Sequence, residues 1–362
     1  MNYFPATLGH IRLRTYLAAG YVLFIMYASL SPFSGWQDQG LGFYEVLSTP
    51  LFARYTWFDI VANLLAYLPF GLLMGLALGT RFGALGSVLL AMFLGASLSA
   101  TMEYAQMYLP TRYSSNLDLL TNTSGALLGA IAAVSIAPRP WFHHYLAHRR
   151  LHLFQTGSER DLGLSLAALW VFAQINPSLP MLGNVFISKV ARIPFAAVKP
   201  PPFRWLESAA VTFNLLMLGM LLLTLLRQRR HTVNALMMVL CVVALAKFVT
   251  AALLLKSWAL LLWINSEAMF GIFSGMLLLA AVTRLQRPQL IGCAALVTVT
   301  YLILANWILD SGRPSAAMRL YQWNYGHLLT YNGLSQTITL VFPFVMLVYL
   351  WRIRSKVMTS VM

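Results

Sequence analysis

The sequence contains few charged residues. They make up 10% of its 362 positions, while apolar residues make up 59% and the mean hydropathy is +0.70. A soluble domain is typically about one quarter charged. A water-soluble fold of this length could not bury so much apolar surface, so the composition excludes a soluble globular protein and indicates an integral membrane protein.

Cysteine is almost absent, and several catalytic motifs are missing. Cys241 and Cys293 both fall inside apolar stretches, so the sequence supports neither a disulfide framework nor a thiolate metal site. A glycine-rich phosphate loop, a Gly-x-Ser-x-Gly elbow and a nucleophilic cysteine arrangement are also lacking. We therefore predict no cofactor. A divalent cation is the one alternative, because it prefers the carboxylate and carbonyl oxygens described below.

Apolar runs long enough to cross a bilayer recur along the whole chain, without the alternating pattern of a transmembrane barrel. Helices satisfy every backbone polar group internally, so we predict an all-α, polytopic transmembrane bundle. About ten spans are expected, at residues 15–33, 58–79, 83–108, 117–137, 162–181, 207–226, 233–255, 261–283, 290–309 and 335–351.

The basic residues predict an orientation. With the N-terminus inside, the inner loops hold fifteen lysines and arginines and the outer loops nine. Because cytoplasmic loops are enriched in these residues, we predict a multi-pass protein of the cytoplasmic (inner) membrane with both termini in the cytoplasm. Short basic loops against anionic lipids account for the net charge of +15, so membrane lipids are expected partners and nucleic acid is not. The sequence indicates no oligomeric state.

An internal repeat is suggested by sliding the sequence on itself. A shift of 149 residues places Leu17-Ala18-Ala19 on Leu166-Ala167-Ala168, and at nearly the same shift Trp57-x-Asp59 meets Trp205-x-Glu207 and Asn116-x-Asp118 meets Asn265-x-Glu267. A unit of four spans keeps its orientation when duplicated, so the repeat would be parallel. We predict domains at 1–149, 150–289 and 290–362. In the second copy Ala252 takes the place of Glu103, so we interpret that copy as a degenerate scaffold.

Polar residues in the first unit gather near one membrane boundary. Asp59 and Asp118 open two spans and Glu103 lies near the end of a third; each carboxylate is followed by an amide three or four residues later, on the same helical face. Charged groups within spans usually face the bundle interior and have a function. With the arginine of the short loop 110–116, the candidate site comprises Asp59, Asn63, Glu103, Gln106, Arg112, Asp118 and Asn122.

These residues resemble the signature of the VanZ-like family. The matching elements are Asp59-x-x-x-Asn63, Pro69-x-Gly71, Glu103-x-x-Gln106, Arg112 and Asp118-x-x-x-Asn122-x-x-Gly125, within roughly the first 137 residues. The family is named for a membrane protein that lowers susceptibility to the glycopeptide teicoplanin. The resemblance implies a role in the cell envelope, and antibiotic resistance with it, without a settled reaction.

Residue chemistry at this boundary suggests a substrate with a lipid tail and an external polar head, such as a lipid-linked or polyprenyl-linked saccharide or a glycolipid. In this hypothesis Glu103 is the general acid, Asp118 its nucleophile or base, and Asp59 a third catalytic carboxylate. Arg112 would bind a phosphate or developing negative charge, while Asn63, Gln106 and Asn122 orient hydroxyls. The reaction would be glycosyl or phosphoryl transfer, or hydrolysis.

Other interpretations remain open from the sequence. The carboxylates and Arg112 could form a structural network that only joins helices. A transporter or flippase is suggested by Pro69 in mid-span and by Lys247 inside the seventh span, although a passive kink and an internally paired amine are ordinary for such residues. A third alternative is a non-catalytic envelope factor that affects glycopeptide susceptibility. Whether the protein is an enzyme is therefore undecided.

The sequence also predicts the placement of two further segments. His143, His144, His148 and His152 have a spacing reminiscent of metal ligands, but they fall in a basic cytoplasmic loop, where a solvated interfacial helix is expected. The proline-rich outer stretch 176–204 is expected to lie along the outer surface as a lid, or to enter the membrane as a re-entrant loop.

Overall fold

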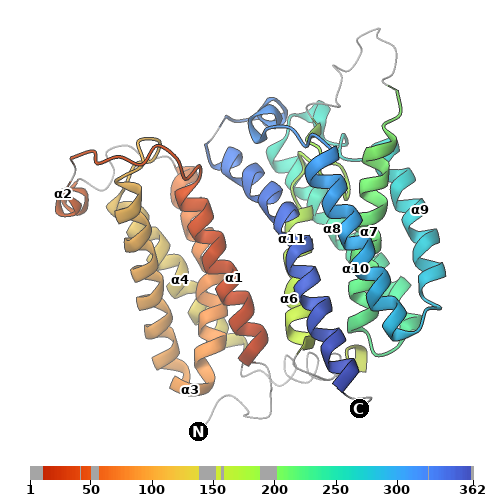
Figure 1. Cartoon of the computed structure of the whole chain (residues 1–362). Helices are drawn as coiled ribbons and strands as arrows, with labels where there is room; N and C mark the ends of the chain where they lie inside the picture. The colour runs from red at the N-terminus through yellow and green to blue at the C-terminus, as the bar shows by residue number, and fades with distance from the viewer. Residues whose placement is uncertain are drawn as a thin grey trace. The chain divides into compact units, whose positions relative to one another are not determined.

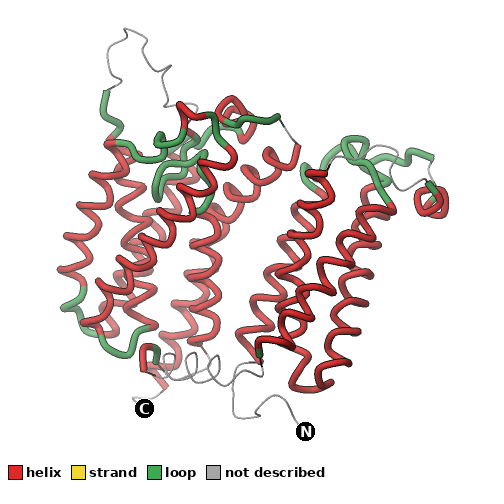
Figure 2. Tube along the Cα trace, turned by 180° about the vertical axis from the view of Figure 1, so that it is seen from behind, coloured by secondary structure: helices red, strands yellow, loops and turns green. Residues whose placement is uncertain are grey.

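The computed structural model describes residues 11–40, 42–49, 57–137, 152–155, 159–187, 202–324 and 326–359. These residues are almost entirely helices and connecting loops, and none of them forms a strand (Figure 2). The all-α prediction is confirmed. The chain divides into two compact units, Met1–His152 and Leu153–Met362, which are described separately.

In the part of the first unit that the structure describes, the main helices are α1 (Ile11–Leu30), α2 (Phe43–Ser48), α3 (Trp57–Gln106) and α4 (Asn116–Ile136) (Figure 1). Helix α3 is two antiparallel arms joined at Gly83, whose φ of 69° is in the left-handed region that favours glycine. Both arms pack against Ala126 of α4. A β-carbon added at Gly71 of the first arm or at Gly95 of the second would contact this residue. Residues 57–82 and 84–106 therefore coincide with the two spans predicted here.

Helix α4 packs against the first arm of α3 at unusually short range. A β-carbon at Gly125 would lie 2.3 Å from the carbonyl oxygen of Leu64, and one at Gly129 would lie 2.0 Å from that of Leu68. Small residues allow such backbone contact in membranes, where apolar burial no longer drives helix association. The glycines of α4 therefore bring the polar starts of α3 and α4 together.

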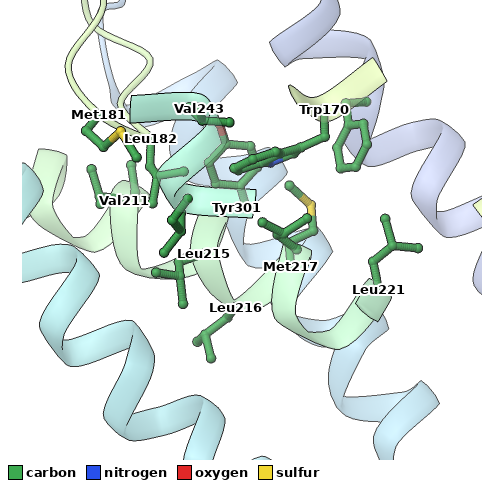
Figure 3. Packing of buried hydrophobic residues seen from close by; sticks show 14 of the residues in the cluster. Trp170, Met181, Leu182, Val211, Leu215, Leu216, Met217, Leu221, Val243 and Tyr301 are labelled. Atoms are coloured by element: carbon green, nitrogen blue, oxygen red, sulfur yellow. The ribbon is translucent and has the colours of Figure 1, made fainter. Parts of the chain in front are cut away.

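The second unit surrounds a central helix. It comprises α6 (Glu159–Gln174), α7 (Trp205–Leu225), α8 (Thr232–Leu254), α9 (Ser266–Val282), α10 (Arg287–Ile303) with a π-helical end (Leu304–Ile308), and α11 (Gly326–Thr359). In α7, 89% of the most apolar window is buried inside the protein. Figure 3 shows Leu215, Met217 and Leu221 of α7 packed near Trp170 of α6 and Tyr301 of α10. An apolar helix enclosed on all sides is the core of this unit.

Among the described residues, seven helices are long and apolar enough to cross a membrane, and one of them, α3, has two arms. The shorter helices α6 and α9, with 16 and 17 residues, coincide with two more of the predicted spans. The protein is therefore a multi-pass membrane protein in contact with lipid. The total of about ten spans stays a prediction. The tandem duplication and the boundary at residue 289 stay predictions.

Residues 175–187, which follow α6, form a non-helical segment inside the second unit. Asn176, Leu182 and Phe186 are fully buried in it. Its backbone is fixed on two sides, because the amide of Met181 donates to Trp263 and that of Phe186 to Ser311. Irregular backbone in a membrane protein is tolerated where it is buried in protein. This part of the predicted outer stretch does not lie along the surface, and residues 188–201 are outside the described residues.

Candidate functional site

Glu103 is the most enclosed of the predicted site residues. It lies near the end of the second arm of α3 and is 4% exposed. One carboxylate oxygen, Oε2, accepts a 2.7 Å hydrogen bond from the backbone amide of Ser115, and the Ser114 hydroxyl donates to the Glu103 carbonyl at 2.7 Å. The loop between α3 and α4 therefore folds back over the carboxylate, which fixes its orientation between the two helices.

The same loop positions Asp118. Ser115 is the N-cap of α4, because its hydroxyl accepts from the amides of Leu117 and Asp118. The Asp118 carboxylate in turn accepts a 2.7 Å hydrogen bond from the Asn63 side chain on the first arm of α3. Ser115 thus binds Glu103 through its amide and starts the helix that carries Asp118.

The three predicted carboxylates interact with one another. The charge of Asp118 acts on Glu103, and that of Asp59 acts on Asp118. They come from both arms of α3 and from α4, so the helix packing brings together residues that are far apart in the sequence. Asp118 is the middle member of the group.

Asn122 belongs to a polar group deeper in the unit. Its amide nitrogen donates to the hydroxyl of Ser99 at 3.0 Å, across from α4 to the second arm of α3. Its Oδ1 is buried without a hydrogen-bond partner among the described residues, and the buried hydroxyl of Tyr67 lies close to Ser99. The charges of Glu103 and Asp118 act on Tyr67. Buried polar atoms are nearly always satisfied, so this interior has unused hydrogen-bonding capacity beside the carboxylates.

Gln106 and Arg112 bind the end of α1. The Gln106 amide donates to the carbonyl of Ser29 at 3.0 Å. The Arg112 guanidinium donates to the carbonyls of Ala28 and Ser31, with Nη2 2.8 Å from the latter. A cation beside the last carbonyls of a helix is favourable, since that end carries partial negative charge. Burial lowers the pKa of Arg112 from its ordinary value. Its role in substrate binding stays a prediction.

Four members of this neighbourhood were not predicted from the sequence. Ser115 binds Glu103, Ser99 binds Asn122, Tyr67 lies near both carboxylates, and Ser29 accepts from Gln106. Two of them follow a detectable spacing, because Tyr67 comes four residues after Asn63 and Ser99 four residues before Glu103. A spacing of four residues places two side chains on the same helical face, so this spacing could have identified Tyr67 and Ser99 from the sequence.

Exposed aromatic residues surround the same end of the first unit. Trp57 is 83% exposed and Tyr113 is 81% exposed, and the Tyr104 ring makes an edge contact with Phe43 of α2. Tryptophan and tyrosine are enriched where membrane spans meet the lipid headgroups. These aromatic residues lie at the end of the unit where the 107–115 loop covers the carboxylates.

Metal binding receives no direct support from the described residues, which contain no group of three or more histidine, cysteine or acidic side chains placed to hold an ion. A divalent cation stays a prediction. Of the histidine cluster, His143, His144 and His148 lie outside the described residues.

Pro69 and Lys247, the two residues that suggested a transporter, have ordinary structural roles. Helix α3 departs from helical geometry only at Gly83 among its described residues, so the helix continues through Pro69. Lys247 is fully buried, and its ammonium donates to the backbone carbonyls of Asn176 and Leu179. Lys247 is therefore an internally paired amine that holds the buried 175–187 segment.

Comparison with known proteins identifies the first unit. Residues 15–137 match the family model described as VanZ/LLP1. Neither the curated proteins nor the solved structures gave a match. The matched range contains all seven residues of the candidate site, so the residues that carried the resemblance lie within a VanZ-like unit.

Proposed function

We propose that the VanZ-like unit of residues 15–137 acts on a lipid-linked saccharide or glycolipid at the outer face of the cytoplasmic membrane. The observation that carries this proposal is the enclosure of Glu103 between helices, with Asp118 in electrostatic range and exposed aromatic residues at the same end of the unit. A substrate that reaches this site from the side needs a lipid tail in the bilayer and a polar head at its surface. Membrane-anchored saccharides meet both requirements.

The proposed reaction is glycosyl or phosphoryl transfer, or hydrolysis, with two carboxylates in separate roles. Glu103 gives its proton to the leaving oxygen as the bond from that oxygen to the anomeric carbon or phosphorus breaks. Asp118 takes a proton from the attacking hydroxyl or water, whose oxygen forms the new bond. Asn63 holds Asp118 in place through its 2.7 Å hydrogen bond, and Asp59 is the neighbouring carboxylate.

The amides divide between binding and support. The unpartnered Oδ1 of Asn122 is an acceptor for a substrate hydroxyl, and the Tyr67 hydroxyl is a donor beside the acid. Gln106 and Arg112 keep α1 against the site through its terminal carbonyls. In this proposal Arg112 also contributes positive charge near the reacting group, where a phosphate or developing negative charge would be stabilised.

The proposal is tested by replacing Glu103 with glutamine in the native host and analysing the extracted envelope lipids and saccharides by mass spectrometry. Glu103→Gln preserves the side-chain shape but cannot donate the acidic proton, so we expect the substrate lipid to accumulate. The matched control is Glu45→Gln, which changes the same residue type on exposed α2. Unaltered lipids in a strain that contains normal amounts of the Glu103→Gln protein would contradict the proposal.

A non-catalytic envelope factor predicts a different result in the same strains. Such a factor needs a folded surface and not an ionisable acid, so teicoplanin susceptibility would be equal in the wild type and in Glu103→Gln. A catalyst predicts that the substitution abolishes any protection. A transporter predicts that the purified protein moves a fluorescent lipid-linked saccharide between vesicle leaflets without changing its mass, whereas the proposed enzyme changes its mass.

A further inference from the structure

A second layer of the chain lies over the loop that covers Glu103. It consists of residues 31–40 and 42–49, which follow α1 and include α2, and we call these residues the strap (Figure 1). The amide of Gln37 donates to the carbonyl of Tyr108 at 2.9 Å, and the Gln39 side chain donates to the carbonyl of Met107 at 2.7 Å. The strap is therefore bound to the start of the 107–115 loop.

The strap is also bound beyond the other end of that loop. The side chain of Asn116, the first residue of α4, donates to the carbonyl of Leu47 at 3.2 Å and to that of Thr49 at 2.6 Å. Between these two attachments, the loop binds Glu103 through the hydrogen bonds described above. The strap thus holds the loop in place at both of its ends, and the loop in turn covers the carboxylate.

This arrangement closes the candidate site. Glu103 is only 4% exposed, so a substrate cannot reach its carboxylate while the covering chain stays where it is. The proposed reaction requires Glu103 to give a proton to a leaving oxygen, and a proton donor must come within about 2.6–3.2 Å of the atom that receives the proton. The structure is therefore a closed form of the site, and the reaction needs an open form as well.

Few contacts restrain the strap. Val46 is the one buried residue among the residues of the strap that the structure describes. Gly35 and Gly40, which lie on either side of Gln37 and Gln39, have φ values of 78° and 69°, and a β-carbon at either glycine would have no neighbour within 4 Å. Active-site lids are drawn from segments with few buried apolar contacts, because such segments open at low free energy. The two glycines can absorb the backbone rotation of a hinge.

We propose that the strap is a lid, which moves away from the 107–115 loop to admit substrate to Glu103 and closes again for the reaction. This inference rests on the function proposed above. The attachments to the loop and to Asn116 are hydrogen bonds that water can replace, so opening leaves no polar group unsatisfied. Closure excludes water from the reacting group. A cover that never moved would instead leave Glu103 with a purely structural role.

The first experiment measures access to Glu103 independently of any reaction. Cys241 and Cys293 are replaced by serine, and Gln37→Cys with Tyr108→Cys then places two thiols where the strap meets the loop, so that oxidation joins them. The purified full-length protein is treated with a water-soluble carbodiimide and glycinamide, which label accessible carboxylates, and the labels are quantified by mass spectrometry. We expect oxidation to slow the labelling of Glu103 at least about tenfold, and reduction to restore it.

Two further variants loosen the strap. Gln39→Ala and Asn116→Ala each remove one side-chain attachment, so each should accelerate the labelling of Glu103 about fivefold or more. Ser48→Ala is the matched control, because the Ser48 hydroxyl donates to the carbonyl of Glu45 within the strap, and its loss should leave the labelling of Glu103 unchanged. Glu45 is exposed on the strap and is the internal reference, which should be labelled at the same rate in every variant.

The second experiment concerns the reaction. Its probe is the total lipid extract of the Glu103→Gln strain, in which the proposed substrate accumulates. We expect the reduced Gln37→Cys, Tyr108→Cys protein to change the mass of a lipid in this extract and the oxidised protein to leave it unchanged.

Three results would overturn the lid. They are equal labelling of Glu103 in the oxidised and reduced protein, no acceleration in either loosening variant, and conversion of the lipid by the oxidised protein as fast as by the reduced protein. A lipid extract that the wild type leaves unchanged contradicts the proposed function instead, and the labelling of Glu103 then decides by itself whether the strap moves.

Discussion

The close contact of α4 with the first arm of α3 gives a sharp prediction for Gly129→Ala. The added β-carbon would lie 2.0 Å from the carbonyl oxygen of Leu68 and 2.7 Å from the amide nitrogen of Leu72. Ordinary van der Waals contact begins near 3.4 Å, and both opposing atoms belong to the backbone. A side-chain rotation cannot relieve the clash, so the helices must separate by more than about 1 Å, an overpacking strain of about 1–3 kcal/mol.

That separation would also reach the candidate site. The Asn63 amide bonds Asp118 at 2.7 Å across the same helix pair, and Gly125 is already within contact of Leu64. A widening of about 1 Å would lengthen this hydrogen bond beyond effective range, because such bonds fall off steeply past roughly 3.2 Å. We expect Gly129→Ala to lower both the thermal stability of the protein and its activity.

The assay compares thermal midpoints of the purified variants in detergent. Gly20→Ala is the matched control, because a β-carbon there would have no neighbour within 4 Å. In a helix interior that change should be neutral or stabilising by roughly 0.5–1 kcal/mol. A Gly129→Ala midpoint equal to or above that of Gly20→Ala would refute the close packing of α3 and α4.

Three other changes test single contacts. Ser115→Ala removes the cap of α4 and should cost about 1 kcal/mol of unfolding free energy, which Ser115→Thr largely preserves; thermal melting measures both. Lys247→Met leaves two carbonyls of the 175–187 segment without their donor and should cost about 1–3 kcal/mol, whereas Lys256→Met at an exposed position should stay within about 0.5 kcal/mol in the same assay. Arg112→Lys keeps the charge but not the planar donor set, so amide exchange near the end of α1 should accelerate while the rest of the unit is unchanged.

The helices were predictable because the bilayer sets their length and composition. The spans expected at 58–79 and 83–108 are the two arms of α3, and their break was marked by a short polar and glycine-containing stretch that ends at Gly83. Convergence of the carboxylates was predictable only in outline. Spacings of three or four residues show which side chains share a helical face, but they say nothing about which faces of different helices meet.

Loop contacts could not be predicted from the same patterns. Nothing in the sequence marks the backbone amide of Ser115 as the partner of Glu103, because every residue but proline has such an amide. The bonds that Arg112 donates to the end of α1 could not be predicted, because they depend on where that helix stops. The burial of residues 175–187 likewise depends on tertiary packing around α7 and on Lys247, which lies far away in the sequence.

The second unit retains acidic residues at positions that align with two carboxylates of the first. The loss of a counterpart to Glu103 suggested a scaffold. In the predicted duplication, however, Glu207 and Glu267 correspond to Asp59 and Asp118, and both glutamates are buried. In the first unit Gly125 approaches the carbonyl of Leu64, and in the second Gly275 approaches that of Thr212, at nearly the shift of the predicted duplication. The duplication stays a prediction, and these paired contacts support it. In the predicted duplication the second copy keeps two carboxylates at helix starts but has Ala252 in place of Glu103, so it lacks the acid on which the reaction proposed for the first unit depends.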